Sequence, residues 1–301
     1  MVSYRTPALL RDCLSALERE RTGLDLEVTV VDNASGDGSA EMVGQHFAWV
    51  RLICNDRNLG FGAAHNQAMR LAVGRYLLVL NSDAIPEAGA LGALVEFLDT
   101  HPDVGVAGPR LRHPDGGFQP SRRRFPTLAT LLFESTQLQR VWPDNAVLRR
   151  YYVADRSPDE PQDVDWLVGA CLCVRASAAA HVGLFDERFF MYSEELDWCR
   201  RFRAAGWRIA YVPGAQVVHL EGASARLDLG ARDGFFQASK LRYAAKWHGP
   251  IVAGALRAYL VFEYLARGVE ESLKLALGSR VGERRARLRV IRSGLRHALH
   301  E

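Results

Sequence analysis

Five acidic side chains stand at points of the sequence where a carboxylate could do chemistry. Asp32 and Asp83 each follow an apolar, strand-like run, so both should lie where a buried strand ends. Glu194, Glu195 and Asp197 follow a run of four aromatic and apolar residues, with Ser193 between the run and the first acid. A carboxylate at a strand end can accept a hydrogen bond from a nucleotide, or hold Mg²⁺ together with substrate phosphates. A partly desolvated carboxylate can act as a general base toward a hydroxyl.

The two strand-end acids also have a structural interpretation. Asp32 could close an Asx turn in the Asp-Asn-Ala-Ser-Gly sequence, and Asp83 could cap a helix beginning at Pro86. Each motif alone favours these roles at least as much as ligand binding. A ligand site is favoured only if the two strand ends lie side by side, so that both acids face one crevice.

The acids at 194–197 have a structural interpretation too. With Ser193 as the N-cap, Glu194 and Glu195 would complement the dipole of the first helical turn, and Asp197 would pair with Arg201 four residues later. The preceding aromatic run favours the catalytic alternative, because a loop packed against a pocket would partly desolvate a carboxylate there.

A glycine-containing segment, Asn-Leu-Gly-Phe-Gly-Ala-Ala-His-Asn at 58–66, stands between a predicted strand and a predicted helix. Such glycines let the backbone approach a diphosphate, which the helix N-terminus attracts. However, His65 stands where a dinucleotide fingerprint has its third glycine, and the segment follows the third strand, so a dehydrogenase is weakly indicated. A plain turn remains the alternative. His219, alone on a short strand, gains a role only if it meets Asp83.

The elements that must position these residues alternate between strands and helices. Strands are predicted at 26–31, 50–54, 75–80 and 104–107, and helices from Thr6-Pro7, up to about 47, at 63–73 and from Pro86 to 98. This alternation predicts a parallel α/β sheet, with ligands at the carboxyl ends of its strands. Further on, the pattern predicts a hairpin turn at 113–117, a strand at 164–174, a helix at 194–205, strands at 208–212 and 216–219, and helices from 232 onward.

Composition limits the class of protein. The 301 residues carry a net charge of only +3, which argues against a nucleic-acid partner. The five cysteines show no disulfide-like spacing, so buried reduced thiols in a reducing cytosol are expected. We find no signal peptide and no apolar run long enough for a transmembrane helix. The last 22 residues hold seven arginines against two acids, a local charge of +5.

Taken in order, the motifs resemble those of the family 2 glycosyltransferases, the inverting GT-A enzymes, and most closely their rhamnosyltransferase-like branch. No single motif is decisive, but eight of them in the right order are specific, and they cover about residues 1–225. The segments that carry the resemblance are VSY (2–4), VDNASGDGS (31–39), NLGFGAAHN (58–66), LVLNSD (78–83), WLVGACLCVR (166–175), VGLFDERFFMYSEELDWCRR (182–201), AGWRIAYVP (205–213) and His219 with Gly-Ala-Ser at 222–224.

The resemblance implies a site for a nucleotide-diphosphate sugar, with dTDP-rhamnose as the first guess and UDP- or GDP-sugars behind it. The acceptor would be a glycan or lipid-linked hydroxyl in cell-surface polysaccharide synthesis. Donor-binding residues would be Tyr4, Asp32, Asn33, Asn58, Gly60, Asn66, Asn81, Ser82 and Asp83. Asp83 and His219 would hold Mg²⁺ or Mn²⁺, Glu195 would be the catalytic base with Glu194 beside it, and the acceptor side would comprise Trp166, Gly169 and Asp197.

The sequence departs from the family pattern at three points. Asn81 takes the first position of the Asp-x-Asp motif, so metal affinity should depend more on His219 and the diphosphate. Glu195 replaces the usual Asp, which adds one methylene of reach. The first strand is only Met1–Tyr4, with Arg5 where Asn is usual, and this short strand should lower stability.

The expected architecture is α/β: a Rossmann-like, mostly parallel GT-A sheet flanked by helices, with a C-terminal helical extension. The catalytic domain would span 1–230, with a donor half of about 1–108 and an acceptor half of about 109–230, and the extension would span 231–301. The arginine-rich helices suit an anionic membrane surface on the inner face of the cell membrane, with packing on the catalytic domain or a homodimer as the alternatives. Two other functions stay open: a catalytically silent nucleotide-sugar-binding module and a sugar nucleotidyltransferase.

Overall fold

A computed structural model describes residues 1–220, 229–278 and 280–300. The chain forms two compact units. The α/β unit comprises residues 1–125, 152–188 and 194–224, and the helical unit comprises 126–151, 189–193 and 225–301. We retain the division into a catalytic domain and a C-terminal extension near residue 230 as a proposal. The motif at 222–224 lies outside the described residues.

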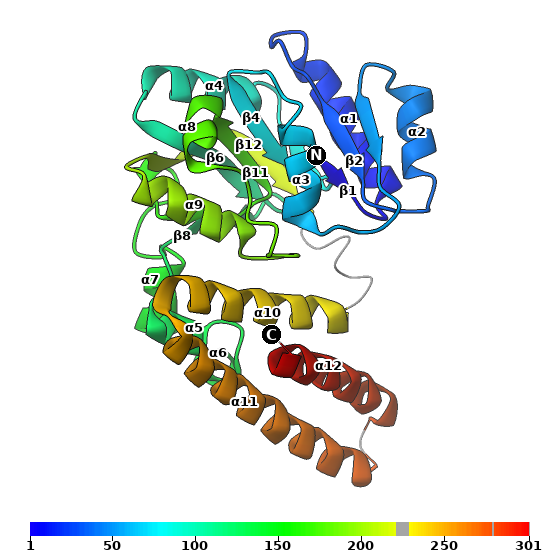
Figure 1. The fold of residues 1–301 in the computed structure, drawn as a ribbon, viewed down its shortest axis with the longest axis vertical. Helices are drawn as coiled ribbons and strands as arrows, with labels where there is room; N and C mark the ends of the chain where they lie inside the picture. Colours follow the sequence, from blue (N-terminus) through cyan, green and yellow to red (C-terminus); the bar gives the residue numbers. More distant parts are fainter. Residues whose placement is uncertain (221–228, 279, 301) are drawn as a thin grey trace. The chain divides into compact units, whose positions relative to one another are not determined.

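The N-terminal part of the α/β unit is parallel, as the alternation predicts. Its three strands lie in the order β1-β2-β3, and a bridge from Val2 to Asn81 brings the end of β4 beside β1. Helices α1 to α3 connect these strands (Figure 1). The elements are β1 (Val2–Ser3), α1 (Pro7–Glu20), β2 (Thr29–Asp32), α2 (Ser39–His46), β3 (Arg51–Cys54), α3 (Phe61–Met69) and β4 (Tyr76–Leu80).

The following strands form a mixed sheet in the order β4-β11-β6-β12-β5, in which β6 and β12 are parallel and the other neighbours antiparallel. The predicted α/β class with flanking helices is therefore confirmed. The elements are β5 (Ala84–Pro86), α4 (Ala90–Thr100), β6 (Val104–Arg112), β7 (Phe118–Gln119), β8 (Arg122–Arg123), β9 (Gln162–Asp163), β10 (Trp166–Leu167), β11 (Cys171–Arg175), α8 (Ala176–Val182), α9 (Glu194–Ala204) and β12 (Arg208–His219).

Three local predictions need correction. Pro86 ends strand β5 and does not begin a helix, because residues 84–86 pair with β12. The predicted strand at 164–174 is divided into β10 and β11, since β10 pairs with β8 and β11 with β4 and β6. The predicted strands at 208–212 and 216–219 form one strand, β12, with a register shift between Val212 and Gln216.

The core of the α/β unit is built from the apolar faces that the sequence periodicity predicts. Leu10, Leu14 and Leu17 of α1 are buried together with Leu94 and Leu98 of α4. The prediction of buried cysteines is correct for four of the five thiols and wrong for Cys54, which is exposed at the end of β3.

The helical unit contains α5 (Leu128–Phe133), α6 (Gln137–Val141), α7 (Ala146–Tyr151), α10 (Leu229–His248), α11 (Pro250–Ala276) and α12 (Val281–His300). Helices α10, α11 and α12 pack against one another (Figure 1). Gly294 allows the close approach of α12 to α11, because an added Cβ would lie 2.4 Å from the Tyr264 ring. Within the described residues, no helix is long and apolar enough to cross a membrane.

Candidate active site

Asp32 lies at the carboxyl end of β2 and is buried. Its Oδ2 accepts a hydrogen bond from the Ser35 N–H group at 3.1 Å, so the carboxylate supports its own turn, three residues on where an Asx turn would bond two residues on. Its Oδ1 is also buried but has no hydrogen-bond partner among the described residues. The carboxylate therefore supports its own turn and still offers one acceptor oxygen.

Asn33 and Asn58 are occupied by the protein itself. The Asn33 amide donates to Asn58 Oδ1 at 2.8 Å and to the Gly60 carbonyl at 3.3 Å, while its oxygen accepts from Asn55 and from the Leu59 N–H group. Asn58 Oδ1 also accepts from the Gly60 N–H group at 2.9 Å. Gly60 has φ of 86°, a conformation that favours glycine. These contacts fix the loop that opens α3.

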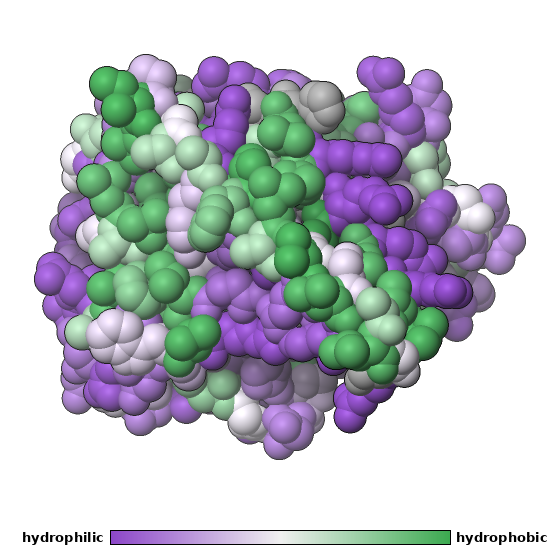
Figure 2. Space-filling view, turned by 90° about the horizontal axis from the view of Figure 1, so that it is seen from below, coloured by the Kyte–Doolittle hydropathy of each residue, from purple (hydrophilic) through white to green (hydrophobic). Residues whose placement is uncertain are grey.

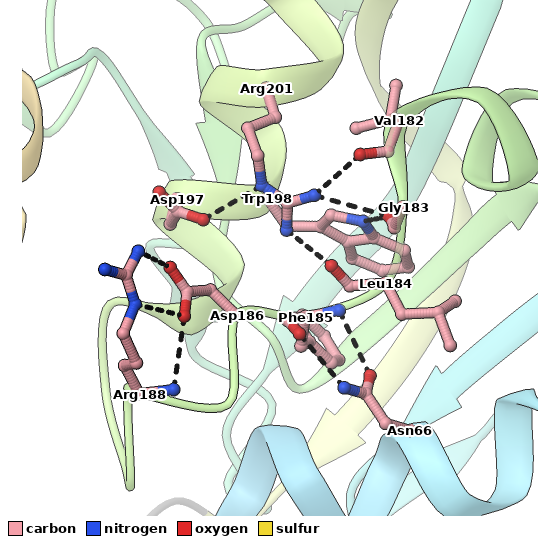
Figure 3. Close-up of polar contacts among 10 residues, drawn as sticks. All are labelled: Asn66, Val182, Gly183, Leu184, Phe185, Asp186, Arg188, Asp197, Trp198 and Arg201. Atoms are coloured by element: carbon pink, nitrogen blue, oxygen red, sulfur yellow. Dashed lines mark hydrogen bonds and ion pairs between the residues drawn. The ribbon is translucent and has the colours of Figure 1, made fainter.

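Asn66 on α3 clamps the segment that leads toward α9. Its Nδ2 donates to the Phe185 carbonyl at 3.0 Å and to Glu187 Oε1 at 2.9 Å, and its oxygen accepts from the Phe185 N–H group at 3.1 Å. Figure 3 shows the amide facing the backbone of Phe185. Its role in donor binding stays a prediction, whereas its role in holding this segment is evident from these contacts.

The side chains of Asp83 and His219 lie close together across the sheet, which is the contact that a role for His219 in the site requires. His219 Nε2 lies 3.3 Å from Asp83 Oδ1, and both side chains are buried. The β5–β12 pairing places His219 opposite Ala84, directly after Asp83. Asn81 Nδ2 lies 3.5 Å from His219 Nε2, and Asn81 Oδ1 is buried with no hydrogen-bond partner in the described part of the chain.

These residues fit a divalent cation. Gln119 Oε1 lies 3.0 Å from His219 Nδ1, so it can accept the Nδ1 hydrogen and leave the Nε2 lone pair facing Asp83. Two ligands about 2.1 Å from one ion and roughly perpendicular lie about 3 Å apart, close to the observed separation. Within the described residues, no cluster of three or more His, Cys, Asp or Glu side chains could hold a metal, so substrate phosphates would have to complete the shell.

The capping role considered for Asp83 goes to a different acid. Helix α4 begins at Ala90, and Glu20 of α1 accepts hydrogen bonds there from the N–H groups of Gly89 at 2.8 Å and Leu91 at 3.4 Å. Asp83 is thus not the N-cap of this helix. Sequence reasoning missed Glu20, because no local signal links a residue of α1 to the start of α4.

Of the two helix caps that the sequence suggests, Thr6 stands at the N-cap of α1 with Pro7 as the first helical residue, and Ser193 does not have the backbone of an N-cap. The Thr6 hydroxyl makes no capping bond but lies 3.0 Å from Ser82 Oγ, so it joins the first helix to the Asn-Ser-Asp segment. Ser193 has φ of 65°, unlike the extended backbone typical of an N-cap. Tyr4, whose ring lies 5.2 Å from the Arg5 guanidinium, is half-buried beside this edge.

Glu194 and Glu195 lie in the first turn of α9 but are not solvated dipole partners. Glu194 is buried and Glu195 half-buried, and the Oε2 atom of each is buried without a hydrogen-bond partner in the described residues. Burial, and next the charge of Glu195, raise the pKa of Glu194 well above its ordinary value. Burial also raises the pKa of Glu195, although the N–H groups of Glu195, Gly169 and Leu196 and the charge of Arg123 partly oppose it.

Gly169 links the candidate base, Glu195, to the strand edge that carries Asp83. A Cβ at Gly169 would lie 3.5 Å from Glu195 Cβ, which is van der Waals contact, so Gly169 packs directly against the Glu195 side chain. The neighbouring Ala170 carbonyl accepts from the Asn81 N–H group at 2.9 Å, next to the Asp83 edge. Because β4 and β11 pair, only a few residues separate the candidate cation ligands Asp83 and His219 from the candidate base Glu195.

Asp197 has the helix partner that its spacing predicts. Its fully buried carboxylate accepts from Arg201 Nε at 3.0 Å. Arg201 continues to the carbonyls of Val182 at 2.9 Å and Leu184 at 2.6 Å, and Figure 3 shows this bridge beside Trp198. These contacts commit Asp197 to holding the 182–184 loop, and its role on the acceptor side stays a prediction.

Trp166 lies on β10 opposite Arg123 of β8, and its indole N–H donates to the Arg124 carbonyl at 3.0 Å. The β8–β10 ladder continues into the Gly169 segment, because the Val168 N–H group donates to the Ser121 carbonyl. Arg123 and Gln119 are site residues that sequence reasoning missed. The triple arginine was visible, but the alternation along a two-residue strand could not show which member faces Glu195.

Solved structures with a similar fold identify the class first. The chain resembles GalNAc-T7 with UDP, GalNAc and Mn²⁺, with a TM-score of 0.59 and 16% identity over 82% of this chain and 47% of that one. It also resembles the mannosyltransferase PcManGT from Pyrobaculum calidifontis in complex with GDP-Man and Mn²⁺, with a TM-score of 0.57 and 17% identity over 99% of this chain and 84% of that one. The fold is thus GT-A.

The family follows from sequence. Residues 1–156 match the sequence model of glycosyl transferase family 2, and the chain belongs to this family. It is 34% identical over 275 residues to an N-acetylglucosaminyl-diphospho-decaprenol L-rhamnosyltransferase of Mycobacterium tuberculosis, covering 84% of this chain and 89% of the relative. It is 27% identical over 187 residues to rhamnosyltransferase WbbL of Escherichia coli, covering 60% and 67%. The predicted family and its rhamnosyltransferase-like branch are confirmed.

Proposed function

We propose that the protein moves rhamnose from dTDP-rhamnose to a hydroxyl of a lipid-linked glycan, with inversion at the anomeric carbon, in cell-surface polysaccharide synthesis. The rhamnosyltransferase relatives, one of which acts on a diphospho-decaprenol-linked sugar, support this choice of donor and acceptor. UDP- and GDP-sugars are the alternative donors. The reaction would take place at the cytoplasmic side of the cell membrane.

One observation carries the proposal: a carboxylate with a raised pKa and a free buried oxygen stands beside the strand edge that holds Asp83 and His219. Glu195 Oε2 is buried and has no hydrogen-bond partner among the residues described, and Gly169 packs against its side chain. Leaving a buried acceptor unpaired costs about 1–3 kcal/mol, so a substrate hydroxyl is its natural partner.

In the proposed reaction, Glu195 takes the proton from the acceptor hydroxyl as its oxygen attacks the anomeric carbon. The new carbon–oxygen bond forms on the face opposite the diphosphate, whose bond to the sugar breaks, so one displacement inverts the centre. Burial and the charge of Glu195 raise the pKa of Glu194 well above its ordinary value, and a neutral Glu194 would avoid two adjacent charges. The leaving diphosphate needs no proton.

On the donor side, Asp32 Oδ1 would accept a hydrogen bond from the nucleobase or ribose. Asp83 and His219 would hold Mg²⁺ or Mn²⁺, with the Asn81 amide nitrogen 3.5 Å from His219 Nε2. A bound cation offsets the charge that develops on the departing diphosphate. Gln119 would keep His219 in the tautomer that presents Nε2.

The decisive experiment compares transfer with donor binding in the Glu195→Gln variant. Loss of the base should lower kcat by about 10²- to 10⁴-fold. The thermal shift caused by dTDP-rhamnose with Mn²⁺ should stay near wild type. Glu160→Gln, which changes an exposed acid, is the matched control. Full activity of Glu195→Gln would refute the base assignment, and donor binding by the wild type without transfer to any acceptor would favour a silent binding module.

A second part of the proposal concerns the membrane. Helix α11 presents exposed apolar residues on one face, Ile251 near its start and then Phe262, Leu265, Val269 and Leu273 at helical spacing, and its C-cap residue Leu277 continues this face. Leu128, Leu132, Leu138, Val141 and Trp142 of the same unit are exposed too, and Figure 2 shows apolar patches with hydrophilic groups beside them. We call the α11 residues the α11 apolar face.

An anionic membrane is the occupant that charge favours. Arg285, Arg289, Arg292 and Arg296 on α12 of the same unit are exposed. An apolar helix face accompanied by arginines suits insertion at the headgroup level of an anionic bilayer. A lipid-linked acceptor would be presented at such a surface. A second copy of the chain is the competing occupant.

Flotation with liposomes tests this part. The Phe262→Asp, Val269→Asp, Leu273→Asp triple variant should lose flotation with phosphatidylglycerol vesicles, which wild type should show more strongly than with phosphatidylcholine vesicles. Val73→Asp, which changes a 90% exposed residue of the α/β unit, is the control. Equal flotation of the triple variant, or a wild-type dimer in gel filtration that the triple variant abolishes without any flotation, would refute membrane docking.

A further inference from the structure

The chain enters α9 through two residues with a left-handed backbone. Tyr192 has φ of 69° and Ser193 has φ of 65°. Residues other than glycine adopt such values rarely, and the values persist only where the surrounding structure imposes them. Glu194 and Glu195 follow directly as the first two residues of α9. The backbone at 192–193 therefore sets the direction from which the chain reaches the candidate base.

Helix α10 holds the segment that contains this turn. The segment, residues 189–193, belongs to the helical unit together with α10. The Ser239 hydroxyl of α10 donates to the Met191 carbonyl at 2.7 Å, and Ser239 is 2% exposed. Because Ser239 is buried, this hydrogen bond lies in a low-dielectric interior, where it is stronger than in water.

Aromatic contacts flank this hydrogen bond on both sides. The centre of the Phe190 ring lies 4.6 Å from that of Phe235. The centre of the Tyr192 ring lies 5.7 Å from that of Phe236. Both separations are in the range of favourable aromatic pairs. Helix α10 thus holds three consecutive residues, 190–192, and the last of them is the first residue of the left-handed turn.

The same helix also holds a segment that is distant in sequence from the candidate base. Gln237 is 2% exposed, and its Nε2 donates to the Ser135 carbonyl at 3.1 Å, between α5 and α6. Ser239 and Gln237 are therefore equally buried and each donates to a backbone carbonyl. Of the two, Ser239 is the one that holds the chain running into α9, so the pair separates a local effect on the base from a general effect on the helical unit.

We propose that Ser239, together with Phe235 and Phe236, positions the catalytic base. The inference rests on the proposed role of Glu195. The α10 residues act through the backbone of 189–193, which fixes where α9 begins and so where the Glu195 carboxylate stands. The base must lie within hydrogen-bond reach of the acceptor hydroxyl, and a displacement of about 1 Å can cost about 100-fold in rate. The helical unit would then contribute to catalysis, in addition to the proposed membrane docking.

The first test compares kcat with KM in Ser239→Ala. Loss of the hydroxyl should lower kcat by about 10- to 100-fold, because the base is no longer held in place. KM for the acceptor, and the affinity for dTDP-rhamnose with Mn²⁺ measured by isothermal titration, should stay within about twofold. Ser239→Thr, which keeps a hydroxyl, should restore most of the rate. Phe236→Leu, which removes the contact with Tyr192, should show the same loss of kcat at unchanged KM.

Gln237→Ala is the matched control for stability. It loses a hydrogen bond of α10 that is as buried as the one made by Ser239. Both variants should lower the melting temperature, but Gln237→Ala should keep kcat within about twofold. A difference in kcat without a matching difference in stability therefore marks a positioning role.

A double-mutant cycle shows whether Ser239 acts through the base. In the Glu195→Gln background there is no base to position, so Ser239→Ala should change the residual kcat by less than about twofold. If Ser239→Ala keeps full kcat, or lowers it no more than Gln237→Ala does, the positioning role is wrong. If it lowers kcat by the same factor in both backgrounds, it does not act through Glu195, and the proposed transfer stands. If Glu195→Gln is fully active, the base assignment fails, and the positioning role fails with it.

Discussion

Two groups of polar side chains in the candidate site differ in how completely the protein satisfies their hydrogen-bonding groups. The amides of Asn33 and Asn66 are occupied by protein donors and acceptors. By contrast, Asp32, Asn81 and Glu195 each keep a buried oxygen that has no hydrogen-bond partner in the described segments. Since unpaired buried acceptors are costly, the difference indicates that the first group supports the site and the second group meets ligands.

The largest effect that sharpens this comparison is expected for Asp83→Ala. Removing a direct ligand should weaken Mn²⁺-dependent donor binding by about 100-fold or more, since even outer-shell changes cost about 10- to 100-fold. Isothermal titration with the donor, with and without Mn²⁺, measures it. Asp37→Ala, which removes only the two hydrogen bonds that Ser39 donates, serves as the control. Donor binding unchanged by Asp83→Ala would rule out Asp83 as a ligand of the cation.

A smaller effect, and of a different kind, is expected for Asn66→Ala. The change leaves the buried Phe185 N–H group and carbonyl without their partner. We therefore expect the free energy of unfolding to fall by about 2 kcal/mol, measured by urea denaturation. Donor affinity of the folded variant should change by less than about threefold. A loss of donor affinity as large as that of Asp83→Ala would break the comparison and place Asn66 in contact with the donor.

The pH dependence gives the smallest expected effect, about tenfold per pH unit. The pKa of Glu195 is raised from its ordinary 4.5, so kcat/KM should rise with pH below the raised pKa and level off above it. Stability should change in the opposite direction. Because the folded state binds this proton more tightly, the unfolding free energy should fall as pH rises from about 4.5 through the raised pKa.

Measurements of kcat/KM and of the free energy of unfolding against pH, for wild type and Glu195→Gln, check both predicted slopes. The variant should lose the Glu195 part of the stability slope. A wild-type rate that falls with rising pH in the same range would contradict the role of a carboxylate base.

Sequence alone determined the features that depend on neighbours along the chain. The strands ending at Asp32 and Leu80, the helix of Glu194 and the Asp197–Arg201 pair follow from apolar runs and i,i+4 spacing. The order of the motifs also determined the family. These signals are local, so they are visible before the chain folds.

Only the tertiary structure decided which distant groups meet. It joined His219 to Gln119 and Asp83 and gave the start of α4 to Glu20. It also decided that the acids of α9 are desolvated while the apolar face of α11 is exposed. Burial and long-range hydrogen bonding depend on how strands pair and helices pack, and no periodicity within one segment encodes those choices.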